Sequence, residues 1–339
     1  MARKTGKPTI VDVARAAGTS VSSVSVALRG EPGVSEQTRL RILDAAQRLG
    51  YRPDQRARLL REQQSRLLGV TFAVNQTFQA EVIDHLYRAA DRSGYDLLLS
   101  ATTPTRSASE AVDDLLRDRC ETLILISPAL DESQLADLST RASVVTIGSE
   151  LRIDAVDSVH SDDRQGVTDV VDHLVGLGHR HITYVDGGTT AMAAVRRTAY
   201  LEAMRGRGLG EHAHVLSGDS TEESGIAAAT RILDSGEPLP TAICTHNDMM
   251  AFGLLHTLRS RGVAVPNDIS VVGFDNTRMA ALATVQLTSV SQDAAQLART
   301  AVERAIMRAE KPAPAEEIVT PARLVIRETS GPPRPRPAE

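Results

Sequence analysis

The sequence has few cysteines, no long apolar run and no secretion signal, and each absence excludes a class of protein. Cys120 and Cys244 are the only two cysteines in 339 residues and lie in separate apolar stretches, so neither a disulfide framework nor a cysteine-based metal site is expected. No apolar run approaches the roughly 20 residues that cross a bilayer. The start of the chain, residues 1–7, is basic but lacks the apolar core of a signal peptide. We therefore expect a cytoplasmic protein that does not contact a membrane.

Signatures of catalysis are also missing. The chain has no glycine-rich phosphate loop, no nucleophile elbow and no metal-binding pattern. His173, His179 and His181 are close in sequence, but no cysteine or carboxylate completes a metal site, and we expect them to be structural. The sequence thus predicts a protein that is not an enzyme and that binds no metal and no cofactor.

Charge is divided unevenly along the chain. Residues 1–66 carry 13 Lys and Arg against six Asp and Glu, a net charge of +7, whereas the remaining residues carry 25 against 37, a net charge of −12. A basic segment attached to an acidic body predicts that the N-terminus meets a polyanion, which the body repels. Nucleic acid is the polyanion that we expect.

Three short helices are predicted in residues 1–52. Each begins at a residue that can cap a helix, Thr9, Ser20 or Ser35, and each ends at a glycine. The connection between the first two is too short for anything but a sharp crossing, which is typical of a helix-turn-helix DNA-binding domain. The expected inward face of the third helix is made of Leu40, Leu43, Ala46 and Leu49.

The second helix is expected to enter the major groove of DNA, because its exposed side chains are short. Serine hydroxyls can bond to bases or phosphates, and valine methyls can touch thymine. The alternative is a small helical bundle with a solvated basic face. The arginines that can hold phosphates are Arg29, Arg39, Arg41 and Arg48. The residues that we expect to contact DNA in this domain are Thr9, Ser20, Val21, Ser22, Ser23, Ser25, Val26 and Arg29.

Residues 53–66 are predicted to form a hinge helix and a linker. Pro53 suits the first turn of a short helix that presents Ala57 and Leu60 on one face, with Arg56 beside them. A helix of this length is unstable alone in water, so we expect it to fold against DNA or a second copy of itself. The alternative is an ordinary linker helix docked on the body.

These N-terminal segments resemble the lactose/galactose repressor (LacI/GalR) family. The matching residues are Pro8 to Ala14, Gly18 to Ser20, Val34-Ser35, Thr38-Arg39 and Leu49 to Pro53. The resemblance implies that two hinge helices pair in the minor groove and insert a leucine between base pairs; Leu60 takes that place, with Ala57 one turn before it. Asp54 stands where many members have Asn, and Val26 where many have Arg. The operator sequence therefore cannot be carried over from a relative.

From residue 67 onward, apolar strand-like runs alternate with helical stretches, which predicts parallel sheets with right-handed crossovers. Runs near 160, 290 and 320 fit neither pattern and are interpreted as crossings between two lobes. The family resemblance continues through Asn247 to Ala251 and Val265 to Asp275, and it implies two doubly wound parallel-sheet lobes like those of periplasmic sugar-binding proteins. The expected strands are 68–74, 96–100, 122–127, 144–148, 181–186, 241–245 and 269–274, and the expected helices are 79–93, 107–119, 162–177, 191–208, 222–235 and 248–262.

Polar residues at the ends of these strands are candidates for binding an effector, because ligands of open parallel sheets bind beyond the carboxyl ends of the strands. Carboxylates and amides suit sugar hydroxyls. The resemblance adds Arg196, with the register uncertain by one because Arg197 follows it, and Phe78 offers an apolar platform for a sugar ring. Capping of the following helix is the alternative for Asn247. The candidates are Asn75, Phe78, Ser127, Ser149, Arg196, Asn247 and Asp275.

The sequence therefore predicts a transcription repressor in which the body, 67–330, binds an effector and dimerises, with a disordered tail at 331–339. One helix-turn-helix contacts one half-site, so we expect a homodimer on a pseudo-palindromic double-stranded DNA operator. We expect a sugar to close the two lobes and change the spacing of the hinge helices. A purine corepressor is an alternative within the same family. A free sugar-binding protein would require a secretion signal and no basic head, and an enzyme on the same fold would require a paired acid and base.

Overall fold

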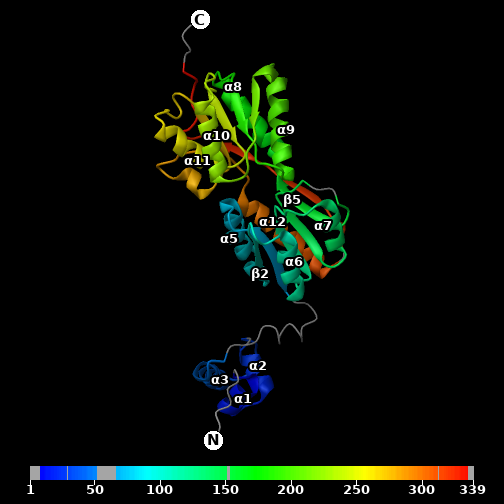
Figure 1. The fold of residues 1–339 in the computed structure, drawn as a ribbon. Helices are drawn as coiled ribbons and strands as arrows, with labels where there is room; N and C mark the ends of the chain where they lie inside the picture. The colour runs from blue at the N-terminus through cyan, green and yellow to red at the C-terminus, as the bar shows by residue number, and fades with distance from the viewer. Residues whose placement is uncertain (1–7, 29, 52–65, 151–152, 312, 335–339) are drawn as a thin grey trace. The chain divides into compact units, whose positions relative to one another are not determined.

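The computed structural model describes residues 8–28, 30–51, 66–150, 153–311 and 313–334 (Figure 1). The chain divides into two compact units, Met1–Ser65 and Arg66–Glu339. No helix of the described ranges is both long and apolar enough to cross a membrane.

The N-terminal unit contains three helices in the order expected of a helix-turn-helix domain: α1 (Ile10–Ala17), α2 (Val21–Leu28) and α3 (Glu36–Leu49). Thr9 and Asp12 form the expected capping box, and Gly18 ends α1 in the left-handed conformation at φ 61°. Val13, Val24 and Ile42, one from each helix, are completely buried in a single small core.

The inward face expected for α3 is wrong for three of its four residues. Leu40, Leu43 and Leu49 are exposed, and the helix packs instead through Ile42, Ala45 and Ala46. Ile42 and Ala46 are four residues apart and therefore lie on one face of the helix. Small side chains at 45 and 46 allow α3 to lie close to α1 and α2, so local hydrophobicity did not indicate the buried face.

The C-terminal unit has two lobes, each built on a six-stranded sheet. The N-lobe sheet has the order β11-β5-β4-β3-β1-β2, and all its pairings are parallel. The C-lobe sheet has the order β12-β10-β9-β8-β6-β7, parallel except for the antiparallel pair β10–β12. The N-lobe strands are β1 (Leu67–Ala73), β2 (Asp96–Thr102), β3 (Thr122–Ile126), β4 (Ser143–Ile147), β5 (Val156–Ser161) and β11 (Glu317–Thr320). The C-lobe strands are β6 (Ile182–Val185), β7 (Ala213–Leu216), β8 (Ala242–Thr245), β9 (Ser270–Asp275), β10 (Thr288–Ser291) and β12 (Arg323–Val325).

Helices cover both faces of each sheet, so central strands are buried on both sides. In β3, Leu123 and Leu125 belong to a core cluster with α6 and α7, whereas Ile124 and Ile126 pack with α5 and α12. The N-lobe helices are α5 (Thr77–Arg92), α6 (Ala108–Arg117), α7 (Glu132–Ser139) and α12 (Ala294–Glu310). The C-lobe helices are α8 (Asp163–Gly176), α9 (Ala191–Gly206), α10 (Glu222–Asp234) and α11 (Asp248–Ser260), with the short 3₁₀ helices η1 (Gly210–His212) and η2 (Arg278–Ala281). Each lobe is thus doubly wound, which confirms the expected fold class.

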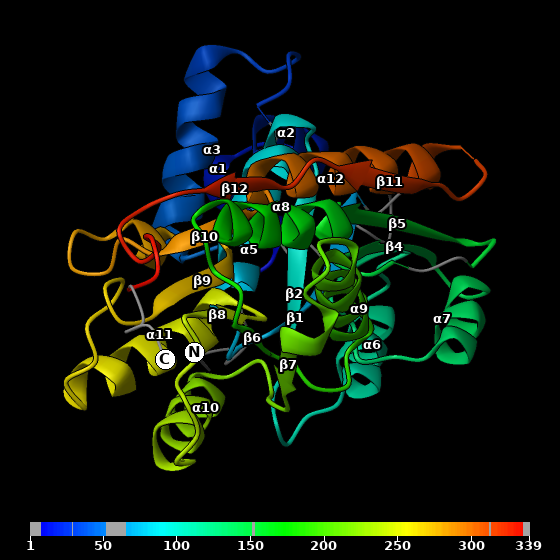
Figure 2. The same cartoon turned by 90° about the horizontal axis from the view of Figure 1, so that it is seen from above.

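The chain passes between the lobes three times: after β5 into α8, after β10 into α12, and after β11 into β12 (Figure 2). These are the places where crossings were expected. The runs near 160, 290 and 320 nevertheless also pair as strands β5, β10 and β11, so the expectation that they fit neither layer is wrong. Elements α7, β7, α12 and β12 were not expected at all.

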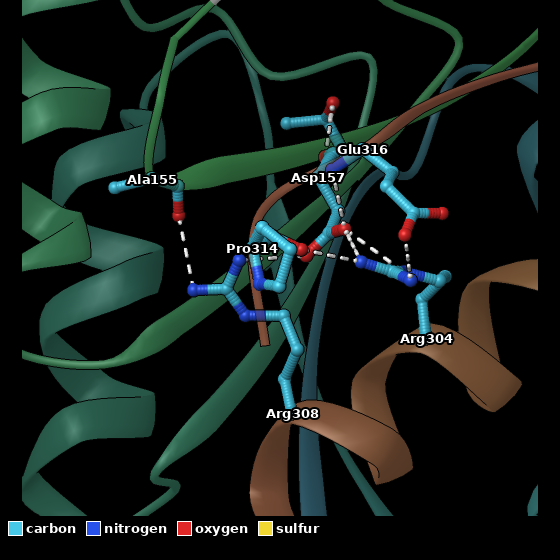
Figure 3. Close-up of polar contacts among 7 residues, drawn as sticks. Ala155, Asp157, Arg304, Arg308, Pro314 and Glu316 are labelled. Atoms are coloured by element: carbon cyan, nitrogen blue, oxygen red, sulfur yellow. Dashed lines mark hydrogen bonds and ion pairs between the residues drawn. The ribbon is translucent and has the colours of Figure 1, made fainter. Parts of the chain in front are cut away.

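A buried ion-pair network attaches α12 to the N-lobe sheet (Figure 3). The Asp157 side chain on β5 is fully buried, and its Oδ1 accepts from Arg304 Nη2 at 2.6 Å and from Arg304 Nε at 2.9 Å. Its Oδ2 accepts from Arg308 Nη1 at 3.0 Å, and the backbone N–H of Glu316 donates to Oδ1 at 3.0 Å. Both carboxylate oxygens are therefore bound, which is the condition under which a buried charge is tolerated.

Residues 331–334, which belong to the tail that was expected to be disordered, contact the C-lobe. The backbone N–H of Gly331 donates to Ser270 Oγ at 3.0 Å, and its carbonyl accepts from His179 Nε2 at 2.8 Å. Arg334 pairs with Asp268 at 2.8 Å. These contacts hold residues 331–334 on the C-lobe, and they give His179 the structural role that the sequence suggested.

Candidate functional site

The N-terminal unit presents a short, hydroxyl-rich face on α2. Ser22 is exposed, and Val21, Ser23, Ser25 and Val26 are partly exposed, whereas Val24 and Ala27 are buried. The predicted recognition side chains are thus accessible, and the two residues that hold the helix in place point inward. This pattern is what a helix needs in order to lie in a groove.

The exposed residues Thr9 and Ser20 are occupied as helix caps. Thr9 Oγ1 lies 2.7 Å from Asp12 Oδ2, and Ser20 Oγ accepts from the backbone N–H of Ser23 at 3.1 Å. The hydroxyl of Ser20 also lies 2.8 Å from the hydroxyls of Ser22 and Ser23. The cap therefore fixes the orientation of the first serines of α2.

Arg39, which was expected to bind a DNA phosphate, instead binds backbone carbonyls within the domain. Arg39 Nη1 donates to the carbonyl of Ala27 at 3.0 Å and Nη2 to the carbonyl of Glu31 at 2.5 Å. Ala27 lies in the last turn of α2 and Glu31 in the loop that follows it, so Arg39 fastens the end of α2 to α3. The remaining predicted DNA contacts, Arg29, Arg56, Ala57 and Leu60, lie outside the described residues.

In the C-terminal unit, loops from the carboxyl edges of the two sheets meet. Gln76, just after β1, donates from Nε2 to the carbonyl of Ser220 at 3.1 Å. Glu81 on α5 accepts from the backbone N–H of Arg278 at 2.8 Å. These bonds join the N-lobe to the C-lobe at the edges where the effector candidates were predicted.

Arg196 is the buried cation of this region. Its Nε donates to Asp163 Oδ2 at 2.6 Å, and its Nη1 donates to the carbonyl of His246 at 2.6 Å. The guanidinium lies over the Phe274 ring, 3.6 Å from the centroid, which is cation–π geometry. Two bonds and an aromatic face therefore fix the plane of the guanidinium.

The structure also shows which of the two neighbouring arginines on α9, Arg196 or Arg197, points inward. Arg196 is 5% exposed, whereas the side chain of Arg197 is 39% exposed and forms an ion pair with Asp186. Tyr200, four residues after Arg196, is fully buried and donates its hydroxyl to the carbonyl of Ile182 at 2.7 Å. Arg196 is thus the arginine of this pair that points inward.

A series of buried polar contacts links Arg196 to Asp275. From Asp163, the series continues through the hydroxyl of Ser161, which donates to Asp163 Oδ1 and lies 2.9 Å from Gln292 Oε1. Gln292 Nε2 then donates to Asp275 Oδ1 at 2.6 Å. All five residues are buried. Ser161 and Asp163 flank the first crossing between the lobes, and Gln292 lies on the second. Asp163, Ser161 and Gln292 were not among the predicted site residues.

Asp275 is held in an unusual environment. Its φ of 113° lies in the left-handed region, which favours glycine, and such strain is a mark of functional sites. Burial raises the pKa of its carboxyl well above the usual value; the charge of Arg196 opposes this, and that of Asp248 adds to it. The Oδ2 atom has no hydrogen-bond donor among the described residues. Asp275 can therefore accept a hydroxyl from a ligand.

Asn247 and Asp248 have structural partners. Asn247 Oδ1 caps α11 by accepting from the backbone N–H of Met250 at 3.0 Å, and its Nδ2 donates to the carbonyl of Ser220 at 3.2 Å. Asp248 accepts from Thr277 and Ser289, and burial raises its pKa to about 6. The capping role weighed for Asn247 is thus present.

Three of the N-lobe candidates lie just after strands and Phe78 lies in the first turn of α5, and their exposure varies. Asn75 and Ser127 are exposed, Phe78 is half-buried against the N-lobe core, and Ser149 is buried. Ser127 has a positive φ of 43°, like Asp275. No group of three or more metal-ligating side chains was found within the described ranges.

Comparison with known proteins places these two units in one family. The family model "Bacterial regulatory proteins, lacI family" matches residues 9–54, and "Periplasmic binding protein-like domain" matches residues 171–330. Catabolite control protein A of Priestia megaterium is 32% identical over 290 residues, covering 84% of this chain and 87% of that protein.

Solved structures agree over almost the whole chain. The Lac repressor dimer bound to operator and the anti-inducer ONPF has a TM-score of 0.80 and 26% identity, covering 96% of this chain and 100% of that one. The complex of the transcriptional regulator CelR with cellobiose has a TM-score of 0.69 and 25% identity, covering 95% and 99%. Together with the helix-turn-helix and the two doubly wound lobes, these matches confirm the resemblance found in the sequence: the chain belongs to the lacI family of bacterial regulatory proteins.

Proposed function

We propose that this chain is a cytoplasmic transcription repressor that binds an operator as a homodimer and changes its DNA affinity when a sugar binds between the two lobes. The relatives are named as transcriptional regulators, and the Lac repressor was solved as a dimer on its operator. The α2 face supports base contact through Ser22, Ser23, Ser25 and the flanking valines, with hinge contacts through Arg56, Ala57 and Leu60 predicted from the sequence alone.

The observation that carries the effector part is the series of buried polar contacts that links Arg196 to Asp275. It supplies a carboxylate oxygen that can accept from a hydroxyl and a guanidinium that can donate to an oxygen, the two functions that recognise a polyol. The CelR structure contains cellobiose, which supports a sugar as the ligand. Asn75, Phe78, Ser127, Ser149 and Asn247 complete the proposed contacts.

The same contacts connect the proposed ligand site to the segments that cross between the lobes. Asp163 begins α8 directly after the first crossing, and Gln292 lies on the second crossing. A ligand that pulls on Arg196 and Asp275 therefore acts on the segments that set the angle between the lobes. The free energy that couples ligand binding to DNA binding cannot exceed the difference in ligand-binding free energy between the two arrangements of the lobes.

The test begins with selection of binding sites from random DNA, where a palindrome is expected for a dimer. Fluorescence anisotropy then measures the affinity for the selected operator while sugars, including cellobiose, are titrated. Asp275→Asn should keep operator binding and lose the sugar response. Asp234→Asn is the matched control, because it alters an exposed ion pair with Arg261 on the C-lobe surface. A sugar response that survives in Asp275→Asn would contradict the assignment.

A further inference from the structure

The end of the chain is attached to the C-lobe in two different ways. Up to Thr329 the attachment uses uncharged groups: the Thr329 carbonyl accepts from the backbone N–H of Val271 at 2.7 Å, and its hydroxyl accepts from the backbone N–H of Thr288 at 2.8 Å. The next residues, 330–334, which we call the strap, depend on titratable side chains as well. These side chains are His173 on α8, His179 just after α8 and Asp268 before β9.

His179 makes the central contact with the strap. Its Nε2 lies 2.8 Å from the carbonyl oxygen of Gly331, and because a carbonyl can only accept, Nε2 carries a proton. Ser270 holds the same residue of the strap, since its hydroxyl accepts from the Gly331 N–H at 3.0 Å. His179 is 1% exposed. The docked strap therefore covers an uncharged imidazole whose single proton is on Nε2.

The other ring nitrogen of His179 has no partner. Nδ1 is buried and makes no hydrogen bond within the described part of the chain. A second proton would have to bind there, which would place a positive charge and an unpaired N–H donor in the interior of the C-lobe. Burial accordingly lowers the pKa of His179, although its hydrogen bond to the Gly331 carbonyl acts in the opposite direction. Docking of the strap and protonation of His179 therefore oppose each other.

No charged side chain described around His179 offsets this cost. On α8, the titratable neighbour is His173, whose charge lowers the pKa of His179 further. Arg180, next in the chain, is exposed and has the same sign of charge as an imidazolium. On the side of β9, Asp268 is engaged by Arg334 of the strap at 2.8 Å. Protonation of His179 is therefore relieved most directly by contact with water.

We propose that the strap is a pH-sensitive device: it is docked while His179 is uncharged, and mild acid releases residues 330–334 while Thr329 and the rest of the C-lobe stay in place. Departure of the strap opens the His179 ring to water, which solvates an imidazolium well. The docking free energy is thus fully present above the ordinary histidine pKa of about 6.5 and decreases as the pH falls below it. This device goes beyond the proposed function, because it requires neither a sugar nor an operator.

Hydrogen exchange of the full-length protein, followed by mass spectrometry at pH 7.5 and pH 5.5, reports on the strap through the amide of Gly331. Protection is measured against an unstructured peptide of the same sequence at the same pH, which removes the intrinsic pH dependence of exchange. We expect the protection of Gly331 to fall by about 10-fold or more, the loss that linkage gives when one group with a free pKa of about 6.5 must be neutral for docking. Unchanged protection overturns the proposal. An equal fall in the amides of β8 also overturns it, because the lobe would then open as a whole.

Three variants separate His179 from the other contacts. His179→Gln keeps an N–H that can donate to the Gly331 carbonyl but cannot take up a proton, so protection at pH 7.5 should remain and its fall at pH 5.5 should shrink by about 10-fold. His256→Gln, at an exposed position on α11, is the matched control and should behave as the wild type. Arg334→Gln removes the ion pair with Asp268 and should lower protection equally at both pH values.

Two results would assign the acid sensitivity to another group and overturn the role of His179. One is a fall of wild-type size in His179→Gln, and the other is the loss of that fall in Arg334→Gln. If His179→Gln leaves Gly331 unprotected even at pH 7.5, the wild type and Arg334→Gln decide the question: a fall in both supports the proposal, and its absence from either overturns it.

Discussion

Removing the charge of Asp157 should cost the body a large part of its stability. In Asp157→Asn, Arg304 and Arg308 lose the carboxylate that they share, and both side chains stay largely buried, at 6% and 13% exposed. Breaking a buried ion pair on one side typically costs about 3–5 kcal/mol. Arg304 keeps its ion pair with Glu316 at 3.1 Å, so we expect the lower end, about 3 kcal/mol. For a unit of this size that loss lowers the melting temperature by about 6 °C.

The measurement is thermal and urea unfolding of the full chain beside a surface control in the same lobe. Asp113→Asn removes the exposed ion pair with Arg141, whose N–O distance is 3.7 Å and whose side chains are both 52% exposed. Such a pair contributes less than about 1 kcal/mol. Equal melting temperatures for the Asp157 and Asp113 variants would refute the argument that burial, and not the mere presence of an ion pair, sets the cost.

Burial also sets the expected cost of changes at Ile42, Asp248 and Gly187. Ile42→Ala should cost about 2–5 kcal/mol, whereas Leu40→Ala, at a position 59% exposed, should change stability by less than about 0.5 kcal/mol; hydrogen exchange in α1 and α3 separates the two. Because burial raises the pKa of Asp248 to about 6 from 3.8, the folded state retains a proton that the unfolded chain releases between these values. The free energy of unfolding should therefore fall as pH rises through this window, and urea titrations of Asp248→Asn should show a smaller fall. Gly187→Ala should lower the melting temperature, because the new Cβ would lie 2.2 Å from the buried ring of His246; a wild-type melting temperature would contradict this reasoning.

Local signals in the sequence predicted the starts of helices and the double winding of the lobes well. The capping box at Thr9 and the buried strand at 122–126 were both recognisable because they depend on neighbours in sequence. The buried face of α3 was not, since hydrophobicity favoured Leu40 over the small Ala45. Helix α12 was missed because its inward face contains several alanines, which carry a weak apolar signal.

The candidate site was predictable only in part for a similar reason. Asp275 and Arg196 could be proposed from a strand end and from the family. The pairing of Arg196 with Asp163 joins residues 33 positions apart, and the contact of Ser161 with Gln292 spans 131 positions. The tertiary fold brings such distant residues into contact, and no spacing in the sequence predicts which of them will meet.

The threefold passage between the lobes has a consequence for how the protein is made. The N-lobe needs α12 and β11, which lie after almost the entire C-lobe in the sequence. During synthesis the nascent chain emerges N-terminus first. The sheet face that α12 covers, and the edge that β11 pairs with, therefore stay exposed in residues 66–161 until residue 320 has left the ribosome. Truncation between the lobes would yield an incomplete fragment, and an early stop codon even near residue 290 would leave neither lobe whole.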